Sequence, residues 1–195
     1  MTGPTARPRL ERRYFEDLYE RDPDPWGFES SAYEKEKYAR TLAALGERRF
    51  DHALEVGCSI GVFTAALAPL CRRLLAVDSS ERAVAAAEQR LSQRPWVRVE
   101  RRTLPEEAPA GPFDLIVCSE VLYYWPEPEL ATGLDALSAS LGQGGLLLAV
   151  HFTEPTRTYP LQGGRVHELL RAHPALRPVL GQERPHYRLD LFERA

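Results

Sequence analysis

The stretch HALEVGCSIGVFTAALAPLCRRLLAVD, residues 52–78, decides the fold class. Two short apolar runs, ALEVG at 53–57 and RLLAVD at 73–78, flank a segment of helical composition, VFTAALAPL. A strand, a helix and a second strand in this order form a right-handed crossover between parallel strands. The stretch therefore predicts an open α/β sheet with a glycine-containing turn at its carboxyl edge, where such sheets bind ligands.

The same alternation continues along the chain. Further strands are predicted at 96–100 (WVRVE), 113–120 (FDLIVCSE) and 146–152 (LLLAVHF), with helices over AVAAAEQRL and from about Glu127 to Leu141. The glycines of GQGG, residues 142–145, predict a turn between that last helix and the strand behind it. This rhythm favours a Rossmann-like, mainly parallel sheet with helices on both faces.

The two ends of the chain differ from this pattern. Two helices are predicted before the first strand, one over about 10–20 and one from Ser30 or Ser31 to about Leu45, with Gly46 as its stop. After a helix at about 165–172, the stretches ALRPVLGQE and HYRLDLFER predict an antiparallel hairpin at the sheet edge. The complete sheet is then expected to have seven strands.

Composition limits the classes of function. The net charge of −3 argues against a nucleic-acid partner, which needs a basic field. There is no run of roughly 18 or more apolar residues, and no apolar run follows the first charged residues, so we expect a cytoplasmic protein with no membrane partner. Cys58, Cys71 and Cys118 lack the spacing of a zinc or redox site and are expected to be structural thiols.

Glycines and an acid at the carboxyl edge indicate a nucleoside ligand. Gly57 and Gly61 follow the first strand, and Asp78 ends the second, where a carboxylate accepts hydrogen bonds from ribose hydroxyls. A dinucleotide fingerprint would need glycine at 59 and 62, where the chain has Ser59 and Val62. A phosphate-binding loop is excluded because no GK[ST] follows.

Four motifs in order carry a resemblance to a known family. EVGCSIG, the acid at the end of the second strand, FDLIVCSEVLYY and GQGGLLL together resemble the successive motifs of class I S-adenosylmethionine-dependent methyltransferases. Ser59 departs from that family's pattern, which has glycine there. The patterns YFEDLYERDPDPWGFESSAYEKEKYARTL, EVGCSIGVFT, SEVLYY and YPLQGGRVHELL are similar to the nodulation protein S-like group of N-methyltransferases, which methylate the free amine of chitooligosaccharides.

The resemblance implies a cofactor and its contacts. The cofactor would be S-adenosylmethionine, with S-adenosylhomocysteine as product and no metal, and 47–195 would form the binding domain. Residues 1–46 would be a helical lid within one structural domain. In the first motif, Gly57, Ser59 and Gly61 would contact the methionine portion. The full set of implied cofactor contacts is the first motif (Glu55, Gly57, Cys58, Ser59, Gly61), ribose and adenine contacts (Asp78, Ser79, Leu104), strand-end residues (Ser119, Glu120) and lid residues (Trp26, Tyr33, Lys37).

Acceptor and catalytic residues are expected at the same edge. His151 ends the fifth strand, where an imidazole of near-neutral pKa can take a proton from the acceptor, and Glu120 can face an amine. The catalytic candidates are His151, Glu120 and Tyr124; the substrate candidates are Tyr123, Tyr124, His151, Tyr159 and His167, with Trp125 in the same aromatic wall. Each of these residues also has a purely structural interpretation, in packing or a hydrogen bond.

The leading hypothesis is a small-molecule methyltransferase that methylates the primary amine of an amino sugar or a similar metabolite, acting as a monomer or homodimer. A small-molecule O-methyltransferase and a non-catalytic cofactor-binding module remain the alternatives, because acceptor sites vary on a shared fold.

Overall fold

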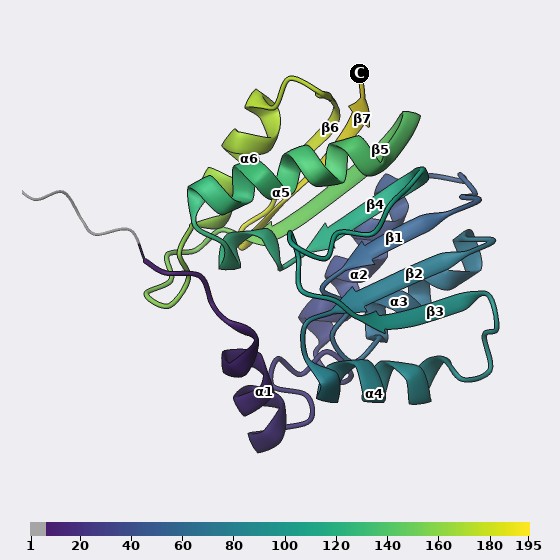
Figure 1. The fold of residues 1–195 in the computed structure, drawn as a ribbon, viewed down its shortest axis with the longest axis vertical. Helices are drawn as coiled ribbons and strands as arrows, with labels where there is room; N and C mark the ends of the chain where they lie inside the picture. The colour runs from purple at the N-terminus through teal and green to yellow at the C-terminus, as the bar shows by residue number, and fades with distance from the viewer. Residues whose placement is uncertain (1–6) are drawn as a thin grey trace, which may run out of the picture.

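The computed structural model describes residues 7–195 and contains a seven-stranded sheet of order β3-β2-β1-β4-β5-β7-β6 (Figure 1). The strands are β1 (Ala53–Val56), β2 (Leu74–Asp78), β3 (Val97–Arg101), β4 (Phe113–Ser119), β5 (Leu141–Phe152), β6 (Leu176–Glu183) and β7 (Tyr187–Arg194). Strands β1 to β5 run parallel, whereas β7 pairs antiparallel with both β5 and β6. The predicted mixed sheet with a C-terminal hairpin is confirmed.

Helices cover both faces of the sheet. Successive residues of the central strands point to opposite faces and both sets are apolar, so each face needs a cover. Leu54 and Ile116 face α5 (Glu127–Ser140) and α6 (Gly163–Ala172). Ala53 and Leu115 face α2 (Ala32–Ala44) and α3 (Val62–Leu67), with α4 (Glu81–Leu91) beside them over Ala76. Figure 1 shows α5 in front of the sheet and α2 and α3 behind it.

The strand order reverses between β1 and β4. From β1 the chain builds outward to β2 and β3, and then returns to add β4 and β5 on the other side. At such a reversal the connections leave to opposite faces and open a crevice at the carboxyl ends of the strands. Residues that follow β1, β2 and β4 therefore meet around one site.

The two N-terminal helices form close to the predicted positions. Helix α1 spans Arg12–Arg21, and α2 begins behind Ser31, whose Oγ accepts a hydrogen bond of 3.3 Å from the Glu34 N–H. Tyr19 of α1 packs on Ile60 and Ala83. Residues 1–6 of the expected lid segment lie outside the described residues.

The predicted turn at GQGG is wrong. Leu141 already pairs with Phe113 of β4, and the next aligned pair is Leu115 with Leu146. The glycines therefore lie in an irregular excursion inside β5, with Gly144 at a φ of +70°. Helix α5 ends at Ser140, and no separate turn is needed because the strand starts at once.

No helix in residues 7–195 has both the length and the apolar character needed to cross a membrane.

Candidate functional site

The turn behind β1 has three residues with left-handed backbone. Gly57, Ser59 and Gly61 have φ of +76°, +50° and +77°. A Cβ at Gly57 would lie 3.1 Å from Cβ and Cγ2 of Val121, so this position needs glycine for space as well as for conformation. Ser59 adopts the strained conformation with its side chain fixed, because its Oγ lies 2.6 Å from the Tyr19 hydroxyl.

Asp78 joins two turns at the end of β2. Its Oδ2 accepts a 2.9 Å hydrogen bond from the Ser59 N–H, and its Oδ1 accepts one of 2.9 Å from the Ser80 N–H. Burial raises the pKa of Asp78, although these backbone donors oppose the shift. Each carboxylate oxygen has a second lone pair, so the side chain can still accept hydrogen bonds from a ligand.

Glu120 follows β4 and is held from several sides. Its backbone is left-handed, with φ of +55°, and its N–H donates to the Val150 carbonyl. Its Oε2 accepts hydrogen bonds from the Tyr123 hydroxyl at 2.6 Å and the Phe152 N–H at 2.9 Å, and its Oε1 accepts from Lys37 Nζ at 2.7 Å. The carboxylate is thus fixed at the crevice, since three neighbours donate hydrogen bonds to it.

Lys37 connects two carboxylates. Its Nζ donates to Glu34 Oε1 at 2.9 Å as well as to Glu120, and its side chain is only 3% exposed. Burial lowers the pKa of Lys37, but the two carboxylates outweigh it and the net shift is upward. Burial raises the pKa of Glu34. Lys37 thus forms its ion pairs with carboxylates of the protein itself.

An aromatic turn, the 3₁₀ segment Leu122–Tyr124, lies beside Glu120. Tyr123 stacks on Tyr159, with ring centroids 4.6 Å apart, and Tyr124 meets Phe15 of α1 edge-on at 4.9 Å. The turn thereby joins three separate parts of the chain. Its rings form an apolar wall next to the buried charges.

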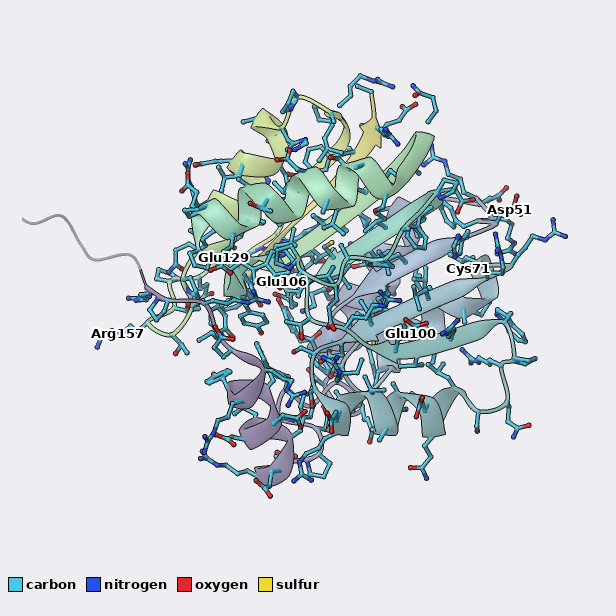
Figure 2. The ribbon with its side chains drawn as sticks, viewed as in Figure 1. Asp51, Cys71, Glu100, Glu106, Glu129 and Arg157 are labelled. Atoms are coloured by element: carbon cyan, nitrogen blue, oxygen red, sulfur yellow. The ribbon has the colours of Figure 1, made fainter. Side chains whose placement is uncertain are left out.

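The segment before α1 crosses the site. The Leu10 N–H donates to the Tyr124 carbonyl at 3.1 Å. The Arg9 guanidinium contacts the Leu104 carbonyl, Glu106 at 2.6 Å and Glu129 at 3.3 Å. Figure 2 labels these two glutamates, which lie where the N-terminal segment meets the body of the molecule.

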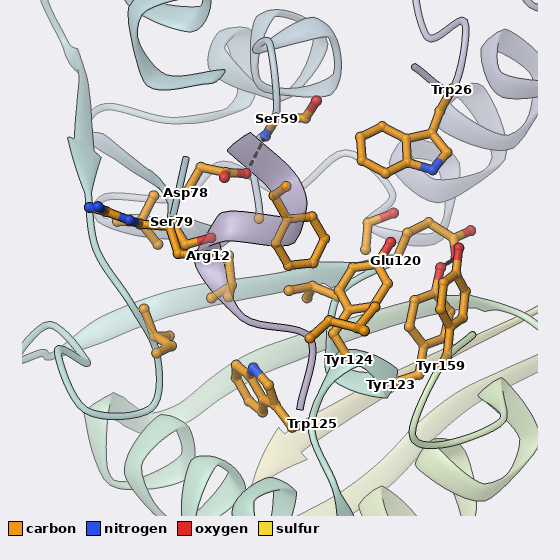
Figure 3. A pocket seen from close by; sticks show the side chains of 18 of the residues that line it. Arg12, Trp26, Ser59, Asp78, Ser79, Glu120, Tyr123, Tyr124, Trp125 and Tyr159 are labelled. Carbon is orange, nitrogen blue, oxygen red and sulfur yellow. Dashed lines mark hydrogen bonds between the residues drawn. The ribbon is translucent and has the colours of Figure 1, made fainter. Parts of the chain in front are cut away.

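These elements enclose a cavity of about 350 Å³ (Figure 3). Asp78, Ser79 and Arg12 lie at one end of it, and Trp26, Glu120 and Tyr159 at the other. The sequence-predicted residues that line the cavity are Trp26, Tyr33, Lys37, Gly57, Ser59, Asp78, Ser79, Leu104, Ser119, Glu120, Tyr123, Tyr124, Trp125 and Tyr159.

Five candidate residues do not line the cavity. Glu55 lies beside Thr64 of α3 and is absent from the cavity lining. Cys58 packs on Ala76 and α4. Gly61 also faces α4, since a Cβ there would lie 3.0 Å from Ala87. His151 and His167 are both fully buried behind the aromatic turn. Across residues 7–195 no cluster of three or more His, Cys, Asp and Glu side chains is arranged to hold a metal ion.

Several lining residues were not predicted from the sequence. They come mainly from the N-terminal segment and from the connection behind β3: Arg9, Leu10, Arg12, Phe15, Tyr19, Phe28, Glu34, Arg102, Thr103 and Phe152. The helical spacing of Phe15 and Tyr19 with other apolar residues was a signal for a buried face. It did not indicate which surface that face would cover.

Comparisons with known proteins agree with this architecture. The family model described as Nodulation protein S (NodS) matches residues 12–148. Nodulation protein S of Sinorhizobium fredii is 39% identical over 127 residues, which cover 63% of this chain and 57% of that protein. The protein of the same name from Bradyrhizobium diazoefficiens is 43% identical over 108 residues, covering 52% and 49%.

The matched region spans about half the length of these curated relatives. Among solved structures, the N-methyltransferase NodS from Bradyrhizobium japonicum WM9 in complex with S-adenosylhomocysteine superposes with a TM-score of 0.83 at 28% identity. That superposition covers 92% of this chain and 97% of the other. Since the family model matches more than half of its residues, the chain belongs to the nodulation protein S family.

Proposed function

We propose that this protein is an S-adenosylmethionine-dependent methyltransferase that methylates the primary amine of an amino sugar or a similar small molecule. Family membership and the likeness to a solved N-methyltransferase with bound S-adenosylhomocysteine support the cofactor. The observation that carries the choice of acceptor is the group of Glu34, Lys37 and Glu120 at one end of the cavity.

The residues at the other end fit the cofactor. Only backbone lines the cavity at Gly57, and Asp78 offers free lone pairs for the two ribose hydroxyls. Ser79 and Leu104 line the cavity near that end, where an adenine ring would lie. When bound, S-adenosylmethionine supplies an electrophilic methyl group on a sulfonium, and the protein contributes mainly position.

The acceptor end favours a cation. Glu34 and Glu120 share one ammonium, that of Lys37, so the group has one carboxylate more than it has cationic partners. Trp26, Tyr123 and other aromatic rings surround these charges, and aromatic faces attract cations in a site that excludes water. An alcohol gains less from this arrangement than an ammonium does.

An amine must lose its proton before it attacks, because only the neutral nitrogen has a lone pair. The raised pKa of Glu34 makes this buried carboxylate a suitable proton acceptor. Lys37 and Tyr123 hold the Glu120 carboxylate, which accepts a hydrogen bond from the amine and orients it. In this proposal Glu120 is the catalytic residue that contacts the acceptor nitrogen.

We also propose that residues 7–46 act as a lid. The contacts of Arg9, Leu10, Phe15 and Tyr19 with the cavity walls support this role, because they close the cavity over Asp78 and the aromatic turn. A closed lid excludes water from the reacting atoms.

The test is methyl transfer to two matched acceptors, an oligomer of glucosamine and an oligomer of glucose. At one carbon of each ring the first has an amine and the second has a hydroxyl. With methyl-labelled cofactor, we expect mass spectrometry to find the label on nitrogen of the amine and none on the alcohol. Labelling of the alcohol alone would identify an O-methyltransferase. Cofactor binding in calorimetry without transfer to either would identify a binding module.

Variants locate the acceptor end. Glu120→Gln is expected to reduce kcat/KM for the amine by about 100-fold, since a charge-assisted contact is lost. Glu36→Gln is the control, because Glu36 lies on the exposed side of α2 in an ion pair with Arg40. Equal activity of both variants would contradict the role of Glu120.

A further inference from the structure

Two buried histidines lie behind the wall of the cavity. His151 lies near the end of β5 and His167 in α6, and neither has any exposed surface. The His151 ring meets the Tyr123 ring edge-on, with centroids 5.2 Å apart. Since Tyr123 lines the cavity and the histidines do not, the histidines act on the site through their neighbours.

A chain of hydrogen bonds links the aromatic turn to the C-terminal hairpin. The Leu122 N–H donates to His151 Nε2 at 3.2 Å. His151 Nδ1 lies 3.2 Å from His167 Nε2, and His167 Nδ1 lies 2.9 Å from Asp190 Oδ2. Each of the four members is buried, so the chain runs through the interior from β7 to the turn.

Only one placement of protons satisfies the chain. A backbone N–H can only donate, so His151 Nε2 must be unprotonated and its proton must lie on Nδ1. That proton is donated to His167 Nε2, which leaves the His167 proton on Nδ1, where it is donated to Asp190. Burial lowers the pKa of both histidines, in keeping with neutral rings.

Two arginines hold the Asp190 end of this hydrogen-bond chain. Arg171 donates to Asp190 Oδ1 at 2.9 Å and to Oδ2 at 3.2 Å, and Arg188 donates to Oδ2 at 3.0 Å. Burial raises the pKa of Asp190, but the hydrogen bonds from His167 and Arg171 and the charge of Arg188 outweigh it, so the net shift is downward. Asp190 is therefore a fixed acceptor that orients the His167 ring.

This arrangement excludes the role first expected for His151. A general base needs a free lone pair that faces the acceptor. The Nε2 lone pair of His151 is occupied by the Leu122 N–H, and Nδ1 faces His167. Neither nitrogen reaches the cavity, since Leu122 and Tyr123 stand between.

We propose that His151 and His167 are positioning residues: through the Leu122 N–H they hold the turn that carries Tyr123 and so fix the acceptor end of the cavity. Tyr123 in turn donates a hydrogen bond to Glu120, so the hydrogen-bonded histidines also help to position the proposed catalytic carboxylate. The kinetic consequence rests on the proposed function, whereas the proton placement does not.

The proton placement is tested first, by ¹⁵N NMR of the histidine rings in the whole protein at neutral pH. We expect an unprotonated Nε2 and a protonated Nδ1 in both His151 and His167, assigned by single substitutions. A proton on Nε2 of His151, or a doubly protonated ring, would overturn the proposal. No acceptor is needed, so this result stands even if methyl transfer is absent.

Kinetics then separate positioning from catalysis. His151→Leu removes the acceptor for the Leu122 N–H and is expected to raise KM for the amine about tenfold, with less than about twofold change in S-adenosylhomocysteine affinity. His151→Gln should recover most of the loss, because its Oε1 can accept the same N–H.

The control is His52→Leu, at the amino end of β1 and away from the cavity, which should leave both constants unchanged. A fall in kcat with unchanged KM for His151→Leu, not rescued by glutamine, would indicate a base and refute positioning.

Discussion

The buried carboxyl of Glu55 predicts how stability depends on pH. The side chain is 3% exposed, and its Oε2 lacks a hydrogen-bond partner among the described residues. Burial, with a smaller contribution from the charge of Asp78, raises the pKa of Glu55 from 4.5 to about 8. The folded protein therefore holds a proton that the unfolded chain releases.

The sign and size follow from this difference. Where the folded state binds more protons than the unfolded state, the free energy of unfolding falls as pH rises. The stabilisation is complete below 4.5 and is lost as the pH rises to about 8. Each pH unit in this window costs ~1.4 kcal/mol, so the total approaches about 5 kcal/mol.

Glu55→Gln keeps the shape of the side chain and removes its titration. We expect urea denaturation to show that the free energy of unfolding of the variant, relative to that of the wild type, rises by about 3 kcal/mol between about pH 5.5 and about pH 8. Glu88→Gln, on the exposed side of α4, is the control and should follow the wild type throughout. Parallel stability curves for Glu55→Gln and the wild type would refute a buried neutral carboxyl.

Three further changes test the site and the core. Gly57→Ala places a Cβ 3.1 Å from Val121 at a φ of +76°, so denaturation should show a loss of about 1–3 kcal/mol, together with weaker cofactor binding. Asp78→Asn should weaken S-adenosylhomocysteine binding in calorimetry by roughly tenfold or more, because ribose loses an anionic acceptor; unchanged affinity would contradict its proposed role. Gly133→Ala brings a Cβ within 2.7 Å of Trp125 Cζ3, and thermal unfolding should show a loss of about 1–3 kcal/mol from overpacking.

Local signals in the sequence predicted the sheet. Alternating strands and helices require a mainly parallel arrangement, and the carboxyl ends of those strands share one edge by geometry alone. Asp78 and Glu120 could therefore be placed at the same crevice from their positions behind two strands. The irregular excursion at 142–145 could not be predicted in the same way, because glycines favour both turns and irregular strands.

Contacts between distant segments could not be predicted. The pairing of Lys37 with Glu120 joins residues 83 positions apart, and the link from His151 to His167 depends on how α6 packs on β5. A lone histidine behind a strand has the same sequence signature whether its ring faces a ligand or a neighbour. The burial of the His151 ring shows that it faces neighbouring side chains, and that burial depends on the whole fold.

Apart from Arg12 of α1 and Glu120 behind β4, the labelled side chains at the two ends of the cavity come from different parts of the chain. Asp78 and its neighbours come from the turns of the central strands, whereas Trp26 and Tyr159 come from the segment between α1 and α2 and the loop between β5 and α6 (Figure 3). Energetic effects of separated sites without shared partners tend to add. Under the proposed function, substitutions in these two connecting segments can therefore change acceptor preference with little effect on the cofactor residues behind β1 and β2.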